Sequence, residues 1–252
     1  TFAVVLGVAG LVLLALRAIP ALAGTGRPAV GAAARIWARL VRAVDYRRLL
    51  FAYLAMISGV SLQLALTAYW IVFAGGSDEA FVGLVIAGMM GATICATPLW
   101  TMAMARLGAK RTALVAAIAY AGASFLLLFV PPAAMMVWAP PSFVLIGAAF
   151  AGIQVAPFSL VAHLIHADAD DATQGSEALL TGIWTAGEKV GLACGSGMAG
   201  LSLAAFGFVS GARHQSAATV EAIGWLIGLG PALLVAAGCL ILFAVRPPDQ
   251  VR

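Results

Sequence analysis

Two charged side chains lie next to each other inside an apolar segment in the second half of the chain. Glu188 and Lys189 interrupt residues 177–206, which are otherwise mostly small or apolar. Inside a bilayer such groups are costly, and those that occur usually face a partner or a water-filled cavity. An ammonium group there can donate hydrogen bonds to an anionic or hydroxylated ligand, and a carboxylate can accept a proton or a cation. The pair is therefore the first candidate site.

The residues that share a helix face with Lys189 indicate what its side chain meets. At about 100° per residue, five residues that are small or hydroxylated lie within about 40° of Lys189. They are Gly182, Thr185, Ala193, Ser196 and Gly200. This face leaves room for solvent or solute, so we expect Lys189 and Thr185 to line a cavity. The alternative is that Lys189 pairs with a fixed acid and only holds helices together.

Glu188 and three glycines occupy the other faces of the same segment. Glu188 projects about 100° away from Lys189, so the two side chains are not expected to face each other. We expect its carboxylate either to bind a proton or cation or to pair with a basic group outside this chain. Gly187 and Gly191 lie nearly opposite Lys189 and, with Gly195, place a small residue every four positions, which favours close helix packing.

Polar side chains in two other apolar segments are further candidates for a solute site. One face of residues 49–74 carries Gln63, Thr67 and Trp70. Trp70 also suits the aromatic belt at the membrane interface, because it lies close to the end of its segment. Gln154 precedes Pro157, and proline frees a backbone carbonyl in a helix. Gln154 is therefore expected either to satisfy that carbonyl or to face the cavity.

Charged residues at the ends of the apolar segments form a second candidate group. They are His163, Asp168, Glu177, Arg106 and Arg111. One interpretation is a set of ordinary solvated loops. The other is a gate at the cytoplasmic side, in which the acidic cluster pairs with arginines of a partner domain.

The composition indicates a membrane protein. The chain has 252 residues, of which 63% are hydrophobic and 10% are charged. A soluble domain has about 45–50% apolar and about 25% charged residues, so this chain has too little polar surface to face water. The net charge of +4 comes from arginines beside apolar segments and not from a base-stacking surface, so no nucleic-acid partner is expected.

The apolar runs predict an all-α integral membrane protein with six complete spans. A span needs about 20 apolar residues. The six are residues 49–74, 80–105, 112–130, 141–166, 177–206 and 220–245, and residues 1–19 form one partial helix. The chain is already apolar at Thr1, so we expect it to start partway through a longer protein.

The distribution of basic residues predicts how these spans are oriented. If the chain threads back and forth, twelve of its fourteen Lys and Arg residues lie on one side, in residues 17–48, 106–111 and 246–252. The positive-inside rule places that side in the cytoplasm. Residues 20–48 are then a cytoplasmic loop, in which Ile36, Leu40 and Val44 at helical spacing indicate either an amphipathic helix along the membrane surface or a solvated linker helix.

No pattern in the sequence indicates an enzyme. There is no G-x-S-x-G, phosphate-binding loop or H-E-x-x-H motif. Cys95, Cys194 and Cys239 lie singly in apolar segments, so we expect neither a disulfide nor a metal site.

Two stretches resemble the major facilitator superfamily. The segment "PLWTMAMARLGAKR", Pro98–Arg111, is similar to the R-x-G-x-K/R loop signature of that superfamily. With its "PLW" it also resembles the melibiose permease-like sugar:cation symporters, the glycoside–pentoside–hexuronide group. A second stretch has the spacing of that group at Asp168, Glu177, Gly182, Trp184 and Lys189.

The resemblance implies the C-terminal half of a transporter in a bacterial inner membrane. On it, residues 1–19 are the end of helix VI, 20–48 the central loop, 49–245 a six-helix bundle and 246–252 a cytoplasmic tail. The partner would be an N-terminal half, the solute a sugar, and the coupling ion H⁺ or Na⁺, with no other cofactor. Two alternatives are a symporter of lysophospholipids in the same superfamily and a membrane protein for assembly or sensing that does not transport.

Overall fold

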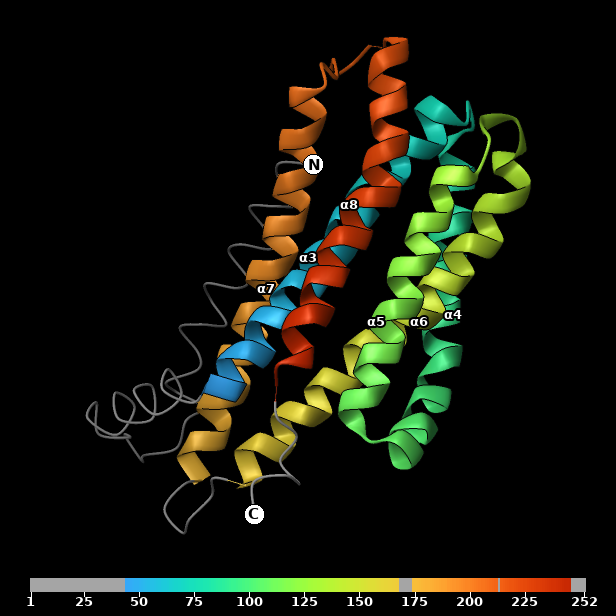
Figure 1. Ribbon diagram of the computed structural model, residues 1–252. Helices are drawn as coiled ribbons and strands as arrows, with labels where there is room; N and C mark the ends of the chain where they lie inside the picture. The colour runs from blue at the N-terminus through green and yellow to red at the C-terminus, as the bar shows by residue number, and fades with distance from the viewer. Residues whose placement is uncertain (1–43, 168–173, 213, 246–252) are drawn as a thin grey trace, which may run out of the picture. The chain divides into compact units, whose positions relative to one another are not determined.

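Six long helices follow one another along the part of the chain that the structure describes. This computed structural model describes residues 44–167, 174–212 and 214–245, without the side chains of 163–167 and 174–180. All of them belong to one unit, Leu40–Arg252. The helices are α3 (Val44–Tyr69), α4 (Glu79–Leu107), α5 (Ala109–Leu126), α6 (Met135–Ala167), α7 (Gln174–Ala205) and α8 (Ala217–Phe243) (Figure 1). A π-helical turn, Trp70–Ala74, extends α3. The predicted partial helix 1–19 and the surface helix of residues 20–43 lie outside the described residues.

Length and apolar composition account for these helices. In hydrocarbon every backbone N–H and C=O must be bonded within the protein, and a helix does this within one segment. Within the described residues, five helical segments are long and apolar enough to cross a membrane, namely Val44–Ala74, Glu79–Leu107, Ala109–Phe129, Pro132–Ala162 and Ala217–Phe243. The 32 residues of α7 are long enough too, but Glu188, Lys189 and several glycines make it less apolar. The predicted all-α membrane fold is confirmed, and each predicted complete span coincides with a helix.

All six helices begin earlier than the sequence predicts, and α3 and α6 differ most from the prediction. α3 begins at Val44 rather than residue 49, and its first turn holds an ion pair between Asp45 and Arg48 at 3.6 Å. α6 begins at Met135 and runs through Pro140 and Pro141 rather than after them. Prolines remove hydrogen bonds to carbonyls four residues earlier. Those carbonyls belong to Met136 and Val137, which are exposed at the helix end, so the loss is tolerated there.

The helices pack in a pattern that repeats after three. α3 packs mainly on α7 and α8, α6 packs mainly on α4 and α5, and α5 also packs on α8 (Figure 1). Exchanging α3 with α6, α4 with α7, and α5 with α8 leaves this set of neighbours unchanged. Since each repeat has three antiparallel helices, the second repeat runs in the opposite direction to the first. The six helices are therefore two inverted three-helix repeats.

Glycines bring α7 into close contact with α3. A side-chain carbon at Gly191 would lie 3.2 Å from the carbonyl oxygen of Leu54, and one at Gly195 would lie 2.7 Å from Cβ of Ser61. The approach allows Oγ of Ser58 to donate to the carbonyl of Gly191 at 3.0 Å. Oγ of Ser61 likewise donates to the carbonyl of Leu192 at 2.6 Å. The predicted packing role of the α7 glycines is confirmed.

The α6–α4 contact, which is the counterpart of the α3–α7 contact under this exchange, is made by the same means. Gly147 of α6 lies against the backbone of Met89 in α4. Oγ1 of Thr93 donates to the carbonyl of Gly147 at 3.0 Å, and Nε1 of Trp100 donates to the carbonyl of Ala148 at 2.6 Å. Small residues and hydrogen bonds between helices replace the hydrophobic effect, which supplies no driving force between apolar helices in lipid.

Two basic side chains donate hydrogen bonds to the backbone carbonyls at the C-terminal end of α8. Nζ of Lys110, at the start of α5, donates to the carbonyl of Phe243 at 3.0 Å and also to that of Val245. Arg48, at the start of α3, donates to the carbonyl of Ala244 at 3.0 Å. These carbonyls lack partners within a helix and carry the negative end of its dipole, which cations stabilise.

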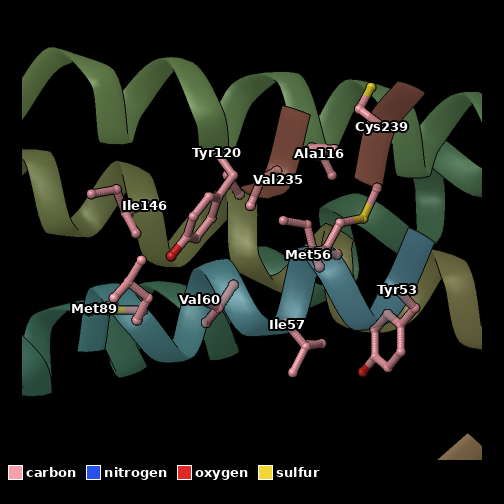
Figure 2. Close-up of a cluster of buried hydrophobic side chains, with 14 of the residues drawn as sticks. Tyr53, Met56, Ile57, Val60, Met89, Ala116, Tyr120, Ile146, Val235 and Cys239 are labelled. Atoms are coloured by element: carbon pink, nitrogen blue, oxygen red, sulfur yellow. The ribbon is translucent and has the colours of Figure 1, made fainter. Parts of the chain in front are cut away.

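Buried side chains of α3 point toward two different neighbouring helices, α8 and α7. Figure 2 shows Met56 on the side of α3 that faces Cys239 of α8, whereas Tyr53 and Ile57 point to the other side. That other side is covered by α7, because Ile57 lies beside Gly191. Tyr53 is thereby directed toward the segment that carries Glu188.

Replacing Gly195 with valine is expected to destabilise the bundle, because the new side chain meets the backbone of α3. The cost of such overpacking is about 1–3 kcal/mol in the free energy of unfolding, measured by SDS titration in detergent with circular dichroism. Gly197→Val is the matched control. A side chain at Gly197 meets nothing within 4 Å, so its effect should stay within about 0.5 kcal/mol. Equal effects of the two substitutions would contradict the packing assigned to Gly195.

Candidate functional site

Lys189 lies on the exposed side of α7. Its side chain is 66% exposed. The residues predicted to share its face are exposed as well, namely Gly182, Thr185, Ala193, Ser196 and Gly200. The hydroxyls of Thr185 and Ser196 donate to carbonyls of the preceding turn of α7, at 2.9 Å and 3.1 Å. The small, hydroxylated face is thus open in the described part of the chain, and its role in lining a cavity stays a prediction.

Glu188 turns toward α3 instead. Its Oε2 lies 3.2 Å from the hydroxyl of Tyr53, and its Oε1 lies 3.4 Å from Nζ of Lys189. The expectation that Glu188 does not face Lys189 is wrong, because the two side chains form an ion pair. Both carboxylate oxygens have partners within the described part of the chain, so neither needs a basic group outside it. The role of Glu188 as a proton or cation site stays a prediction. The two Cβ directions do diverge by about 100°. The flexible four-carbon stem of lysine nevertheless lets the ammonium reach back to its neighbour.

Tyr53 links Glu188 to a third helix. Its hydroxyl lies 2.8 Å from Oε1 of Gln154 in α6. Its ring stacks on Trp184, with the ring centroids 4.3 Å apart and the planes 17° from parallel. Both rings are 1% exposed, so the phenol is held in place and only its hydroxyl proton is free to turn.

Gln154 therefore takes neither of the two roles expected for it. Its side-chain oxygen contacts Tyr53, which is neither the backbone carbonyl freed by Pro157 nor an open face. Gln154 is linked to Glu188 through the tyrosine, and its place in a solute site stays a prediction. The structure brings together Gln154, Glu188 and Lys189, and adds Tyr53 and Trp184.

Tyr53 was not singled out by its sequence pattern. It occupies an ordinary buried position on α3, one turn before Ile57 (Figure 2). One signal for it exists: a tyrosine deep in an apolar segment needs a hydrogen-bond partner when buried. Glu188 and Gln154 are polar residues of other segments that supply such partners.

The polar stripe of α3 does not face an open cavity, which corrects the prediction for Gln63, Thr67 and Trp70. Gln63 and Thr67 are 0% exposed, and Trp70 is 3% exposed. Oε1 of Gln63 accepts from Oγ of Ser124 in α5 at 2.8 Å, and Oγ1 of Thr67 donates to the carbonyl of Gln63 at 2.7 Å. Trp70 packs against Phe143 of α6, so it does not lie in an interfacial belt either. The two neighbouring helices cover this face of α3.

The predicted cytoplasmic gate is described only in part. Arg106 and Arg111 are exposed on either side of the turn at Gly108, which has a φ of 79° that favours glycine. His163, Asp168 and Glu177 lie outside the residues whose side chains the structure describes.

The arrangement around Glu188 offers two kinds of chemistry. The ammonium of Lys189 has free donors on an exposed face and can bind an anion or a hydroxyl group. The carboxylate of Glu188 is bonded on one side to that ammonium and on the other to a buried phenol, so a change in its charge affects both sides of α7.

The comparison with known families agrees with this architecture. Residues 1–246 match the family model described as MFS/sugar transport protein. No curated protein matches the sequence.

We predict that Tyr53 and Glu188 stabilise the bundle jointly. Tyr53→Phe and Glu188→Met should have effects on the free energy of unfolding that deviate from additivity by about 1–2 kcal/mol, because each removes the same charge-assisted hydrogen bond. Tyr120→Phe is the control, since the buried Tyr120 hydroxyl has no hydrogen-bond partner in the described part of the chain. Combined with Glu188→Met it should be additive within about 0.5 kcal/mol. Additivity in both pairs would show that the contact contributes nothing.

Proposed function

From the premise that this chain belongs to the major facilitator superfamily, in the family described as MFS/sugar transport protein, we propose that it is one half of a cation-coupled symporter of a sugar or related small solute. The family makes the protein a secondary transporter of the membrane. The identity of the solute, the coupling and the division into halves are the proposed parts.

The repeated helix pattern supports the proposal of a half. In major facilitator transporters each six-helix half contains two inverted three-helix repeats, and the solute site lies between the halves near the middle of the membrane. Helices α3–α8 contain one such pair of repeats. We propose that an N-terminal half completes the transporter and that the two halves rock against each other to give alternating access.

The exposed face of α7 carries the proposal of a solute site. In lipid, an ammonium group on an exposed helix face is costly, whereas facing a hydrated cavity it is not. The 66% exposure of Lys189 among small and hydroxylated residues fits a surface turned toward the second half. Lys189 then donates to the solute, with Thr185 beside it. Glu188 holds the coupling ion, and Gln154 supports it through Tyr53.

The basic residues indicate the orientation. Arg48, Lys110 and the C-terminal end of α8 meet at one end of the bundle, and Arg106 and Arg111 flank the nearby α4–α5 turn. By the positive-inside rule we propose that this end is cytoplasmic, as expected for a protein of a bacterial inner membrane.

Removing the ammonium group should abolish transport without loss of the protein from the membrane. In vesicles that contain both halves, Lys189→Ala is expected to lower uptake of radiolabelled sugars at least about tenfold, which corresponds to about 1.4 kcal/mol of lost interaction. Arg47→Ala, which removes a positive charge from an exposed position on α3, is the charge-matched control and should leave uptake unchanged. Normal uptake by Lys189→Ala would reject Lys189 as a solute contact.

The division into halves has its own test. Vesicles that contain this chain alone should take up none of a panel of labelled sugars, because the solute site needs both halves. Vesicles that also contain a matching N-terminal half should take up at least one. Uptake by the chain alone would contradict the proposal of a half.

A further inference from the structure

The Tyr53 hydroxyl lies near two acceptor oxygens but has only one proton to donate. The tyrosine hydroxyl has one proton to donate. It lies within hydrogen-bond distance of two oxygens that are acceptors when Glu188 is ionised, Oε1 of Gln154 at 2.8 Å and Oε2 of Glu188 at 3.2 Å. One of these two contacts must therefore carry its proton in the opposite direction.

Two arrangements satisfy all three groups. In the first, Glu188 is ionised and accepts from Tyr53, while the amide of Gln154 is turned so that its nitrogen donates to the phenol oxygen. In the second, Glu188 is protonated and donates to the phenol oxygen, while Tyr53 donates to the carbonyl oxygen of Gln154. The two ends of a glutamine amide have nearly the same shape, so the first arrangement differs from the second by one proton and one amide flip.

We propose that Glu188 binds the coupling proton of the transporter, and that its protonation reverses the hydrogen bonds from Glu188 through Tyr53 to Gln154. The inference rests on the proposed function and names the coupling ion as H⁺. The proton comes from the aqueous phase and attaches to a carboxylate oxygen of Glu188. No other bond forms or breaks, and the charge of the Glu188–Lys189 pair changes from zero to plus one.

The groups that face Glu188 favour a proton over a metal cation. Glu188 contacts the phenol of Tyr53 in α3 and the ammonium of Lys189 in α7. The neutral amide of Gln154 in α6 and the ring of Trp184 in α7 contact Tyr53. The Lys189 ammonium, 3.4 Å from the carboxylate, already supplies the positive charge that a bound Na⁺ would bring. That ammonium opposes the binding of any further positive charge, a proton included. A sodium ion also needs a set of oxygen ligands, whereas a proton needs only one carboxylate oxygen.

Because the Tyr53 ring is held in place, a change in its hydrogen bond to Glu188 of α7 also changes its hydrogen bond to Gln154 of α6. Trp184 and the tight α3–α7 contact hold the Tyr53 ring, so the hydroxyl proton and the Gln154 amide are the groups that respond. Gln154 precedes Pro157 within α6, where the helix lacks one hydrogen bond. On the other side of α7, protonation releases Lys189 from its carboxylate partner, so its ammonium is free for the solute.

Infrared difference spectroscopy of the chain in lipid nanodiscs tests the inference. The sample is titrated over roughly pH 3 to 9, which covers the range in which most protein carboxyl groups take up protons. We expect a protonated-carboxyl band that grows as the pH falls and is absent from Glu188→Gln. We also expect a side-chain amide band that shifts with it and is absent from Gln154→Leu.

The variant Tyr53→Phe tests the direction in which the tyrosine hydrogen bond shifts the protonation of Glu188. It removes a charge-assisted hydrogen bond from ionised Glu188 and only a neutral one from the protonated form, so protonation becomes easier. The midpoint of the carboxyl band should move to higher pH by about one pH unit. Tyr120→Phe, which removes another buried hydroxyl, should leave it unchanged. Glu188→Gln offers Tyr53 an amide N–H at every pH and should hold the Gln154 band at its low-pH position.

Failure of this inference is distinguishable from failure of the proposed function. If Glu188→Gln removes no titrating band, or Tyr53→Phe leaves the midpoint unchanged, the proton site is rejected even where uptake depends on Lys189. If the bands behave as expected but the assembled halves take up none of the labelled sugars, the proton site stands and the proposed sugar symport fails.

Discussion

The structure depends on how one apolar helix accommodates two adjacent charges. In hydrocarbon neither a carboxylate nor an ammonium is stable without polar surroundings. α7 provides them on two different sides, with the Glu188 carboxylate turned inward onto Tyr53 and the Lys189 side chain largely exposed. The inward side requires α3 to lie close, and the glycines of α7 permit this approach. The close packing of α7 on α3 and the placement of its two charges therefore depend on each other.

The two repeats share a scaffold but not its charges. In the two matching contacts between the repeats, α3 with α7 and α6 with α4, the helices pack tightly at glycines and are joined by hydroxyl or indole hydrogen bonds to backbone carbonyls. Between Glu79 and Arg106, α4 carries no charged residue, whereas α7 carries the charged pair in its middle. The two tight contacts make rigid groups of helices that can move as units. The charged pair of α7 places the polar site in one of these two contacts. Such a combination suits alternating access, in which rigid bundles move around a fixed site.

Periodicity along single helices predicted much of this arrangement. The six spans, the glycine face of α7 and the exposed face around Lys189 follow from residue type and helical spacing alone. The stripe of Gln63, Thr67 and Trp70 shows where such reasoning ends. Its residues do share a face, but a helix does not specify which neighbours cover that face, and here α5 and α6 bury it. The partner of Glu188 was out of reach for the same reason, because Tyr53 and Gln154 lie on helices that are distant in the sequence.

The central claim is that one face of α7 lines a hydrated cavity while the opposite face is sealed against α3. A cysteine scan along α7 tests it most directly, in the two assembled halves, with Cys95, Cys194 and Cys239 replaced by serine and a membrane-impermeant maleimide as the probe. The account predicts labelling at the exposed positions Thr185, Ala193, Ser196 and Gly200, and protection at the buried positions Trp184 and Ala199. Protection at every position would mean that the face of Lys189 meets lipid or protein. Labelling at the buried positions instead would mean that α7 is rotated, and either result would contradict the account.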